Sequence, residues 1–202
     1  MSERDEVIFR EPIKAQKDVK VKIQSVENTE WKPKQAVMDV ANAEGKTLNE
    51  SYKAVKLSVT ITDDTVQCEN PDATPRSQID DQFNIQRYPF VDNKKGGVLG
   101  WMNRGKLFQL ETAFGFDPCF EDKDGQPIEA AITRNGNKVA PKVDGVARVL
   151  NPSFVGAYMN EDGTINPSNW VGKEIRIDAG IEKSEQYGDK NVIKAYKKGD
   201  LI

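Results

Sequence analysis

Aromatic side chains that stand beside lysine or arginine are the residues of this sequence best suited to binding a ligand. Trp31 is followed by Lys32 and Lys34, and Arg87 precedes the aromatic residues of the segment YPF at 88–90. An aromatic ring presents a flat face on which another planar group can stack. Lysine and arginine attract anions such as phosphate. These residue types favour a ligand that carries planar groups and negative charge.

Residues for enzyme chemistry are sparse. The chain has no histidine, which excludes His-based acid–base catalysis, Ser-His and Cys-His nucleophile pairs and HExxH zinc sites. Its two cysteines, Cys68 and Cys119, are too few for a four-cysteine zinc site. The segment DKDGQPIEA at 122–130 lacks the spacing of an EF-hand, and no GxxxxGK[ST] or GxGxxG motif occurs. We therefore predict no catalytic residue, no metal site and no cofactor, and expect a protein that is not an enzyme.

The net charge of −3, from 29 Lys and Arg against 32 Asp and Glu, hides segments of opposite charge. Acidic residues concentrate at 63–72 and 117–129, whereas 134–148 and 190–198 are mainly basic. The total argues against nucleic-acid binding, but the segregation permits a local basic groove. With 202 residues, 37% of them hydrophobic, the chain is long enough for one domain with its own core.

The N-terminal segment, MSERDEVIFREPIKAQ, is charged and lacks the apolar centre of a signal peptide. No apolar run approaches the roughly 20 residues that a membrane helix needs. We therefore expect a cytoplasmic protein without membrane contact. In a reducing cytoplasm, the two cysteines are expected to be structural or incidental thiols.

Alternation of apolar and polar residues predicts three strands in the first half of the chain. Residues 19–24 and 52–62 alternate, each with one apolar face. Residues 79–90 form a third strand, which Pro89 is expected to end. Residues 27–50, between the first two strands, are expected to form a long polar connection.

One helix and a hairpin are predicted in the second half. Residues 103–114 have apolar side chains at helical spacing, with Asn103 as a plausible N-cap and Gly115 as the residue that stops the helix. Residues 173–181 and 191–197 alternate again and are expected to form the closing hairpin. The order is therefore three strands, one helix, an irregular segment and two strands.

This order predicts a mostly β domain: a five-stranded OB-fold Greek-key barrel with one helix between strands 3 and 4. A β-sandwich with a stray helix has the same pattern and stays open as an alternative. The single domain spans 19–198, with a loop-rich insertion at about 116–168 that contains a hairpin turn at 134–137. An N-terminal arm (1–18) and a short C-terminal tail (199–202) flank it.

Three motifs follow one another in a recognisable order: LFQLETAFG at 107–115, WVGKEI at 170–175 and KNVI at 190–193. They resemble the xLxxLxxAxG helix, the closing L-x-G-K-x-x-x-V motif and the last strand of a family of phage-encoded single-stranded-DNA-binding-like proteins. The resemblance covers roughly residues 19–115 and 168–198. It implies a non-catalytic protein of a phage or phage-like element that binds single-stranded DNA in replication or recombination, in the host cell cytoplasm. It also implies a homo-oligomer and replication or recombination proteins as partners.

For the site, this resemblance implies that bases stack on aromatic rings and that Lys or Arg contacts phosphates. OB-fold binding surfaces lie on the second and third strands and nearby loops, where Tyr52 and Lys56 are expected to point outward; the closing hairpin is the other candidate face. Trp101, just before the helix, is expected in the core. The predicted nucleic-acid-binding residues are Lys20, Lys22, Trp31, Lys32, Lys34, Tyr52, Lys56, Arg87, Tyr88, Phe90, Tyr187, Lys194, Tyr196 and Lys197.

Two other functions fit the sequence. One is a viral structural or protein-interaction β-domain that binds no nucleic acid, with the acidic loops and the insertion as contact surfaces. The other is a nuclease or other metal enzyme, which would need two loop carboxylates that converge on a metal ion.

Overall fold

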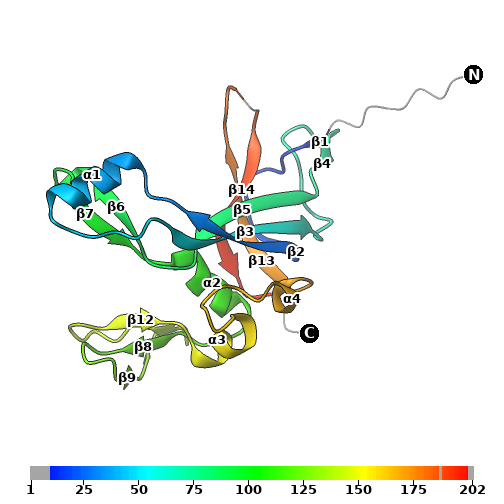
Figure 1. The fold of residues 1–202 in the computed structure, drawn as a ribbon. Helices are drawn as coiled ribbons and strands as arrows, with labels where there is room; N and C mark the ends of the chain where they lie inside the picture. The colour runs from blue at the N-terminus through cyan, green and yellow to red at the C-terminus, as the bar shows by residue number, and fades with distance from the viewer. Residues whose placement is uncertain (1–9, 187, 200–202) are drawn as a thin grey trace, which may run out of the picture.

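A five-stranded antiparallel sheet forms the centre of the computed structural model, which describes residues 10–186 and 188–199 (Figure 1). Its strands are β2 (Gln16–Trp31), β3 (Tyr52–Ile61), β5 (Gln78–Asn84), β13 (Glu174–Glu182) and β14 (Lys190–Lys197). They lie in the order β14-β13-β2-β3-β5, and every neighbouring pair is antiparallel. The mostly β fold and the closing hairpin predicted from the sequence are confirmed.

Strand β2 shows how the alternating sequence builds the sheet. Val19, Val21 and Ile23 are buried, whereas the residues between them are exposed. The register with β3 then shifts between Ile23 and Ser25. An extra residue of this kind bends a strand and changes which face the next side chain occupies. As a result, Val26 is also buried, and β2 continues beyond its pairing with β13, still paired with β3, as far as Trp31.

The predicted helix is α2 (Gly105–Ala113), which lies between β5 and β13 in the chain and packs its two leucines into the core. The expected N-cap is wrong. Arg104 occupies that position without a side-chain capping bond, and Asn103 lies outside the helix. The expected stop is right, because Gly115 has a φ of 92° just after the C-cap residue, a conformation that favours glycine.

The segment expected to be a loop-rich insertion is more structured than predicted. Within it, β8 (Cys119–Glu121), β9 (Pro127–Ile128) and β12 (Ala147–Val149) form a small sheet, which we call the insertion arm. The turn at 134–137 joins β10 (Ala131–Ile132) to β11 (Lys138–Val139). Two short helices follow, α3 (Pro152–Tyr158) and α4 (Pro167–Trp170). They contribute Phe154 and Trp170, both fully buried, to the main core.

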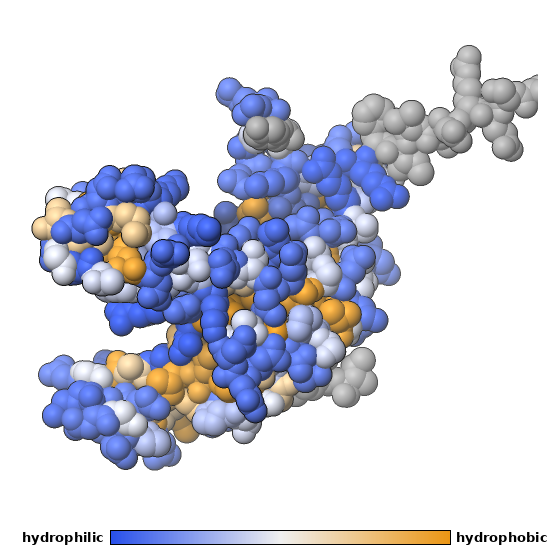
Figure 2. Space-filling model, viewed as in Figure 1, coloured by the Kyte–Doolittle hydropathy of each residue, from blue (hydrophilic) through white to orange (hydrophobic). Residues whose placement is uncertain are grey.

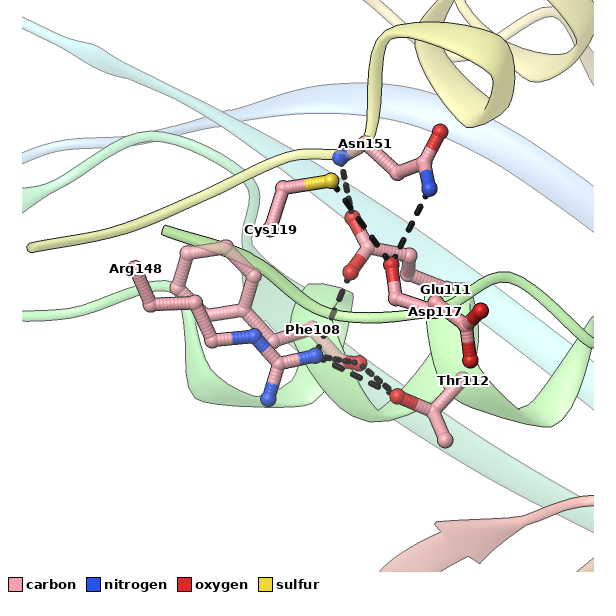
Figure 3. A network of polar contacts seen from close by, with 7 residues as sticks. All are labelled: Phe108, Glu111, Thr112, Asp117, Cys119, Arg148 and Asn151. Carbon is pink, nitrogen blue, oxygen red and sulfur yellow. Dashed lines mark hydrogen bonds and ion pairs between the residues drawn. The ribbon is translucent and has the colours of Figure 1, made fainter. Parts of the chain in front are cut away.

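A buried carboxylate, Glu111 of α2, connects the helix to the insertion (Figure 3). Arg148 donates to its Oε1 at 3.2 Å, and the Asn151 backbone N–H donates to its Oε2 at 2.8 Å. The Arg148 guanidinium also donates to the Phe108 carbonyl at 3.0 Å and lies 4.6 Å from the centre of the Phe108 ring. Burial raises the pKa of Glu111, and its bonds to Asn151 and Arg148 oppose that rise.

A second projection, the helix-hairpin arm, consists of α1 (Gln35–Ala43), β6 (Tyr88–Asp92) and β7 (Val98–Met102). Val37, Ala41 and Leu99 form its own small core. Figure 2 shows the indentation that separates this arm from the insertion arm.

The helix-hairpin arm corrects two predictions. The expected polar connection at 27–50 contains the end of β2 and helix α1. The expected third strand at 79–90 is two strands, because the chain bends after Asn84 and pairs again only from Tyr88. Pro89 lies within β6 rather than ending it; proline is tolerated there because the hairpin has only two strands and free edges.

Side chains, rather than a backbone ladder, join the two edges of the main sheet. Among the described residues no strand pairing links β14 to β5, and no closed barrel is found. Instead, the Tyr196 hydroxyl of β14 donates to Oδ2 of Asp81 in β5 at 2.6 Å. Lys106 of α2 donates to both oxygens of the same carboxylate, each at 2.6 Å.

The N-terminal segment docks on the sheet where the structure describes it. Strand β1 (Arg10–Glu11) pairs in parallel with β4 (Thr74–Pro75). Ile13 is fully buried, and its backbone N–H and carbonyl both bond to the side chain of Asn191, each at 2.8 Å. Residues 10–15 of the expected N-terminal arm are therefore fixed to the domain.

Candidate functional site

A pocket of about 640 Å³ opens where the helix-hairpin arm meets β5 and α2. Trp31, Tyr88 and Met102 line it from the side of the arm. Phe83 and Asn84 of β5 face them, and α2 adds its first turn and Gln109. We call this the aromatic pocket. Its size is typical of sites that bind small molecules or single groups of larger ligands.

Trp31 and Tyr88, both predicted from the sequence as stacking residues, form one wall of the aromatic pocket. Their ring centres are 5.0 Å apart and the ring planes are inclined by 60°. Both side chains are half-buried, so each ring packs on its neighbour and still reaches the solvent. The bulged, long strand β2 carries Trp31 to this position, and the bend after β5 brings Tyr88 beside it.

Tyr52 supports this wall and does not itself face the solvent. Its side chain is only 3% exposed, so the expected outward, ligand-facing position is wrong. The ring centre lies 5.9 Å from that of Trp31, and the hydroxyl accepts a hydrogen bond from the Asn49 backbone at 3.2 Å. Alternation along β3 places Tyr52 on the same face as Lys56, but at this end of the strand the Trp31 ring and the Asn49 backbone pack against it and bury it.

Amide side chains form much of the rest of the aromatic pocket. Gln82, Asn84 and Asn103 line it, and no hydrogen bond from their side-chain amides to another described residue is found. Gln109 also lines the pocket, and its Oε1 accepts the Tyr196 backbone N–H at 3.0 Å. A side-chain amide carries both donors and an acceptor. The free amides can therefore bind a ligand edge that offers both kinds of group.

Tyr196 belongs to the core beneath the aromatic pocket, so the expectation that it stacks with a ligand is wrong. It is 4% exposed, and its ring centre lies 6.1 Å from that of Phe83. Burial, followed by the nearby Asp81 carboxylate, raises the pKa of Tyr196 well above its usual value. The hydroxyl therefore stays protonated and acts as a donor to Asp81, which ties β14 to β5.

Trp101 is an exposed aromatic residue that the sequence interpretation placed in the core. It is 42% exposed on β7, and the Arg87 guanidinium lies 5.8 Å from its ring centre. Arg87 is exposed, whereas Phe90 is half-buried, with its ring against Gly100. The nearness of Trp101 to a helix in sequence suggested burial. Only its place on a two-stranded hairpin with a free face leaves it exposed.

Lys56 lies in a second hollow, of about 530 Å³, on the outer face of β3 and β5. Gln82 lines both this hollow and the aromatic pocket, so the two meet there. The charged residues around the second hollow are Glu27, Lys56, Asp80, Asp81, Glu182 and Lys190. Acids outnumber lysines, which makes this hollow a poor phosphate site by itself.

The remaining predicted cations are divided between two regions. Lys32 and Lys34 are exposed just before α1, on the helix-hairpin arm. Lys197 forms ion pairs with Asp18 at 3.1 Å and with Asp178 at 2.8 Å.

The other three predicted lysines lie on the main sheet. Lys20 and Lys22 are exposed on β2, and the Lys194 side chain packs over Gly180. None of these three lines the aromatic pocket. Tyr187 lies outside the described residues.

Comparisons with protein-family models, curated proteins and solved structures find no match for this chain. Among the described residues, no cluster of three or more Cys, Asp or Glu is arranged to hold a metal ion. None of the helices in that part of the chain is long and apolar enough to span a membrane. The candidate site therefore has to be judged on its own geometry.

Proposed function

We propose that this protein binds single-stranded DNA without catalysing a reaction on it, in the replication or recombination of a phage or phage-like element. The proposal rests on the wall formed by Trp31 and Tyr88, which lies beside the side-chain amides of Asn84 and Asn103; no hydrogen bond from these amides to another described residue is found. A single strand exposes the faces and edges of its bases, and base–aromatic stacking contributes about 1–3 kcal/mol per base.

Exposed cations around the helix-hairpin arm provide phosphate contacts. Lys32, Lys34 and Arg87 lie on this arm together with Trp101. If these three cations each neutralise one phosphate, the affinity falls about 20-fold between roughly 50 and 200 mM salt. That dependence is modest, as expected for a protein with a net charge of −3.

The strand order supports this function. In an OB-fold the first strand lies between the second and the fourth, and the fifth lies beside the fourth. The order β14-β13-β2-β3-β5 follows the same scheme, opened between β14 and β5. We read the sheet as an OB-fold whose last seam is held by Tyr196 and Asp81. The aromatic pocket then lies beside the third strand, a usual binding surface of that fold.

The test is fluorescence anisotropy with labelled oligo-dT about 20 nucleotides long, and duplex of equal length as control. We expect binding of the single strand at micromolar or lower Kd, weaker duplex binding, and intact oligonucleotide after incubation with Mg²⁺ or Mn²⁺. Tyr88→Ala, in the wall of the aromatic pocket, should weaken binding about five-fold or more. Val171→Ala, at an apolar site 48% exposed just after α4 and outside the aromatic pocket, is the control. No single-strand binding at about 50 mM salt would refute the proposal.

The alternative function, a protein-interaction domain, draws on a different surface. Ile132 and Val143 of the insertion are 69% and 59% exposed, and Val139, on the strand that pairs with that of Ile132, is 40% exposed. They are a candidate contact for self-association or for replication or recombination proteins. Size-exclusion chromatography with light scattering distinguishes a monomer from an oligomer, and Ile132→Asp should dissociate an oligomer that uses this surface.

A further inference from the structure

We infer that the aromatic pocket reads the hydrogen-bonding edge of an unpaired nucleobase through the side-chain amides of Asn84 and Asn103. This inference rests on the proposed single-strand binding and adds base preference to it. It starts from the composition of the pocket, in which aromatic groups and free amides share one space.

The aromatic wall limits how a base can enter. The Trp31 and Tyr88 rings already contact each other, with centres 5.0 Å apart and planes inclined by 60°, so a base stacks on an exposed face of one ring instead of between the two. Met102 pairs with Tyr88 across the hairpin, points to the same face and is 42% exposed. Together, Tyr88 and Met102 form a soft, flat platform from which the base edge projects toward β5 and α2.

The residues that this edge would meet are amides. Asn84 ends β5 and Asn103 lies between β7 and α2, so they approach the aromatic pocket from two elements. Among the described residues that line the pocket, Lys106 is the one with a charged side chain, and Asp81 holds it at 2.6 Å. A neutral pocket with donors and acceptors suits a base edge better than a phosphate.

Recognition through edges has two consequences. In a duplex the same edges are occupied by the complementary strand, so the aromatic pocket selects single strands. Bases also differ in the order of their donors and acceptors, so a fixed pair of amides binds some bases better than others. Sequence-independent stacking proteins have no such preference, because every base has a flat face.

The experiment compares the anisotropy Kd of oligo-dT, oligo-dC and oligo-dA of equal length, and of an abasic strand. We expect the best base to bind at least about five-fold more tightly than the worst, and the abasic strand to bind most weakly. Asn84→Ala and Asn103→Ala should each reduce the ratio between bases, whereas Asn42→Ala, at an exposed amide on α1, should leave it unchanged. Stacking within the free strands affects wild type and variants alike and cancels in this comparison.

The outcomes separate this inference from the proposed function. Tight binding of all strands with equal Kd, or variants that keep the wild-type ratio, overturns the base-reading site and leaves single-strand binding intact. No binding of any strand overturns both. A second arm adds free deoxynucleoside monophosphates. If the monophosphates bind the aromatic pocket and the strands do not, the pocket is a site for free nucleotides, and the proposal that it recognises single strands is wrong. Melting curves of each variant verify folding.

Discussion

Replacing Glu111 by Ala should detach the insertion from helix α2. Glu111 is fully buried and accepts hydrogen bonds from Arg148 and from the Asn151 backbone. Without the carboxylate, the Asn151 N–H is left without an acceptor, which costs about 1–3 kcal/mol. Loss of one partner of a fully buried ion pair costs about 3–5 kcal/mol. The Arg148 side chain is 32% exposed, so water recovers part of that loss.

Removing the Glu111 carboxylate also removes the unfavourable burial of its charge, which further reduces the cost of the Glu111→Ala substitution. Burial raises the pKa of Glu111, which means that the surroundings do not fully compensate the carboxylate. We therefore expect Glu111→Ala to lower the free energy of unfolding by about 2–3 kcal/mol. Glu111→Gln keeps the shape and one acceptor, and should cost about 1 kcal/mol or less at neutral pH. Urea denaturation followed by tryptophan fluorescence measures both values.

The Gln variant also gives a test by pH. Glu111 has its pKa raised on folding from the reference value of 4.5, so the folded state holds a proton that the unfolded state has already released. The native protein should therefore lose stability relative to Glu111→Gln as the pH rises above 4.5, until the folded-state pKa is passed. Above that pH the difference stays constant. The measured quantity is the free energy of unfolding of the wild type minus that of Glu111→Gln. If it stays constant or increases as the pH rises from 4, this account of the network is refuted.

Two further substitutions test the sheet seam and the helix-hairpin arm. Tyr196→Phe removes the 2.6 Å hydrogen bond to Asp81 and should lower the free energy of unfolding by about 1.5 kcal/mol; an unchanged denaturation midpoint would show that the bond does not stabilise the seam. Gly100→Ala would place a Cβ 2.7 Å from the Phe90 ring, and should destabilise the arm by about 1–3 kcal/mol and weaken oligonucleotide binding. If melting temperature and binding both equal those of the wild type, the close contact is not a constraint.

Local patterns predicted the elements whose side chains face one core throughout. These patterns are the alternation in β2 and β13, the apolar spacing of α2 and the glycine at its end. Each depends only on residues close together in sequence, so it predicts the local structure directly. Elements with mixed surroundings were missed. Helix α1 was missed although its sequence, QAVMDVANA, is largely apolar, because polar residues flank it and it packs within the helix-hairpin arm instead of on the main core.

Individual site residues could be predicted by type, but their exposure could not. Tyr52 and Tyr196 both follow the alternation of their strands, and both are buried: Tyr52 beside Trp31, and Tyr196 against Phe83 with its hydroxyl on Asp81. Trp101 is exposed because it lies on a two-stranded hairpin. Whether an aromatic ring is a ligand platform or part of the core depends on which distant segment covers it, and this is information that a local pattern does not contain.

The amino-acid sequence by itself determined a mostly β chain with a central helix, no histidine and cations near Trp31 and Tyr88. Only the tertiary structure decided that these two rings share a wall and that Asn84 and Asn103 line the same pocket. It also decided that Lys197 is engaged in ion pairs away from the aromatic pocket. The physical reason is that composition and periodicity act over a few residues, whereas a site is an arrangement of residues distant in sequence, which the bulge in β2 and the bend after β5 bring together.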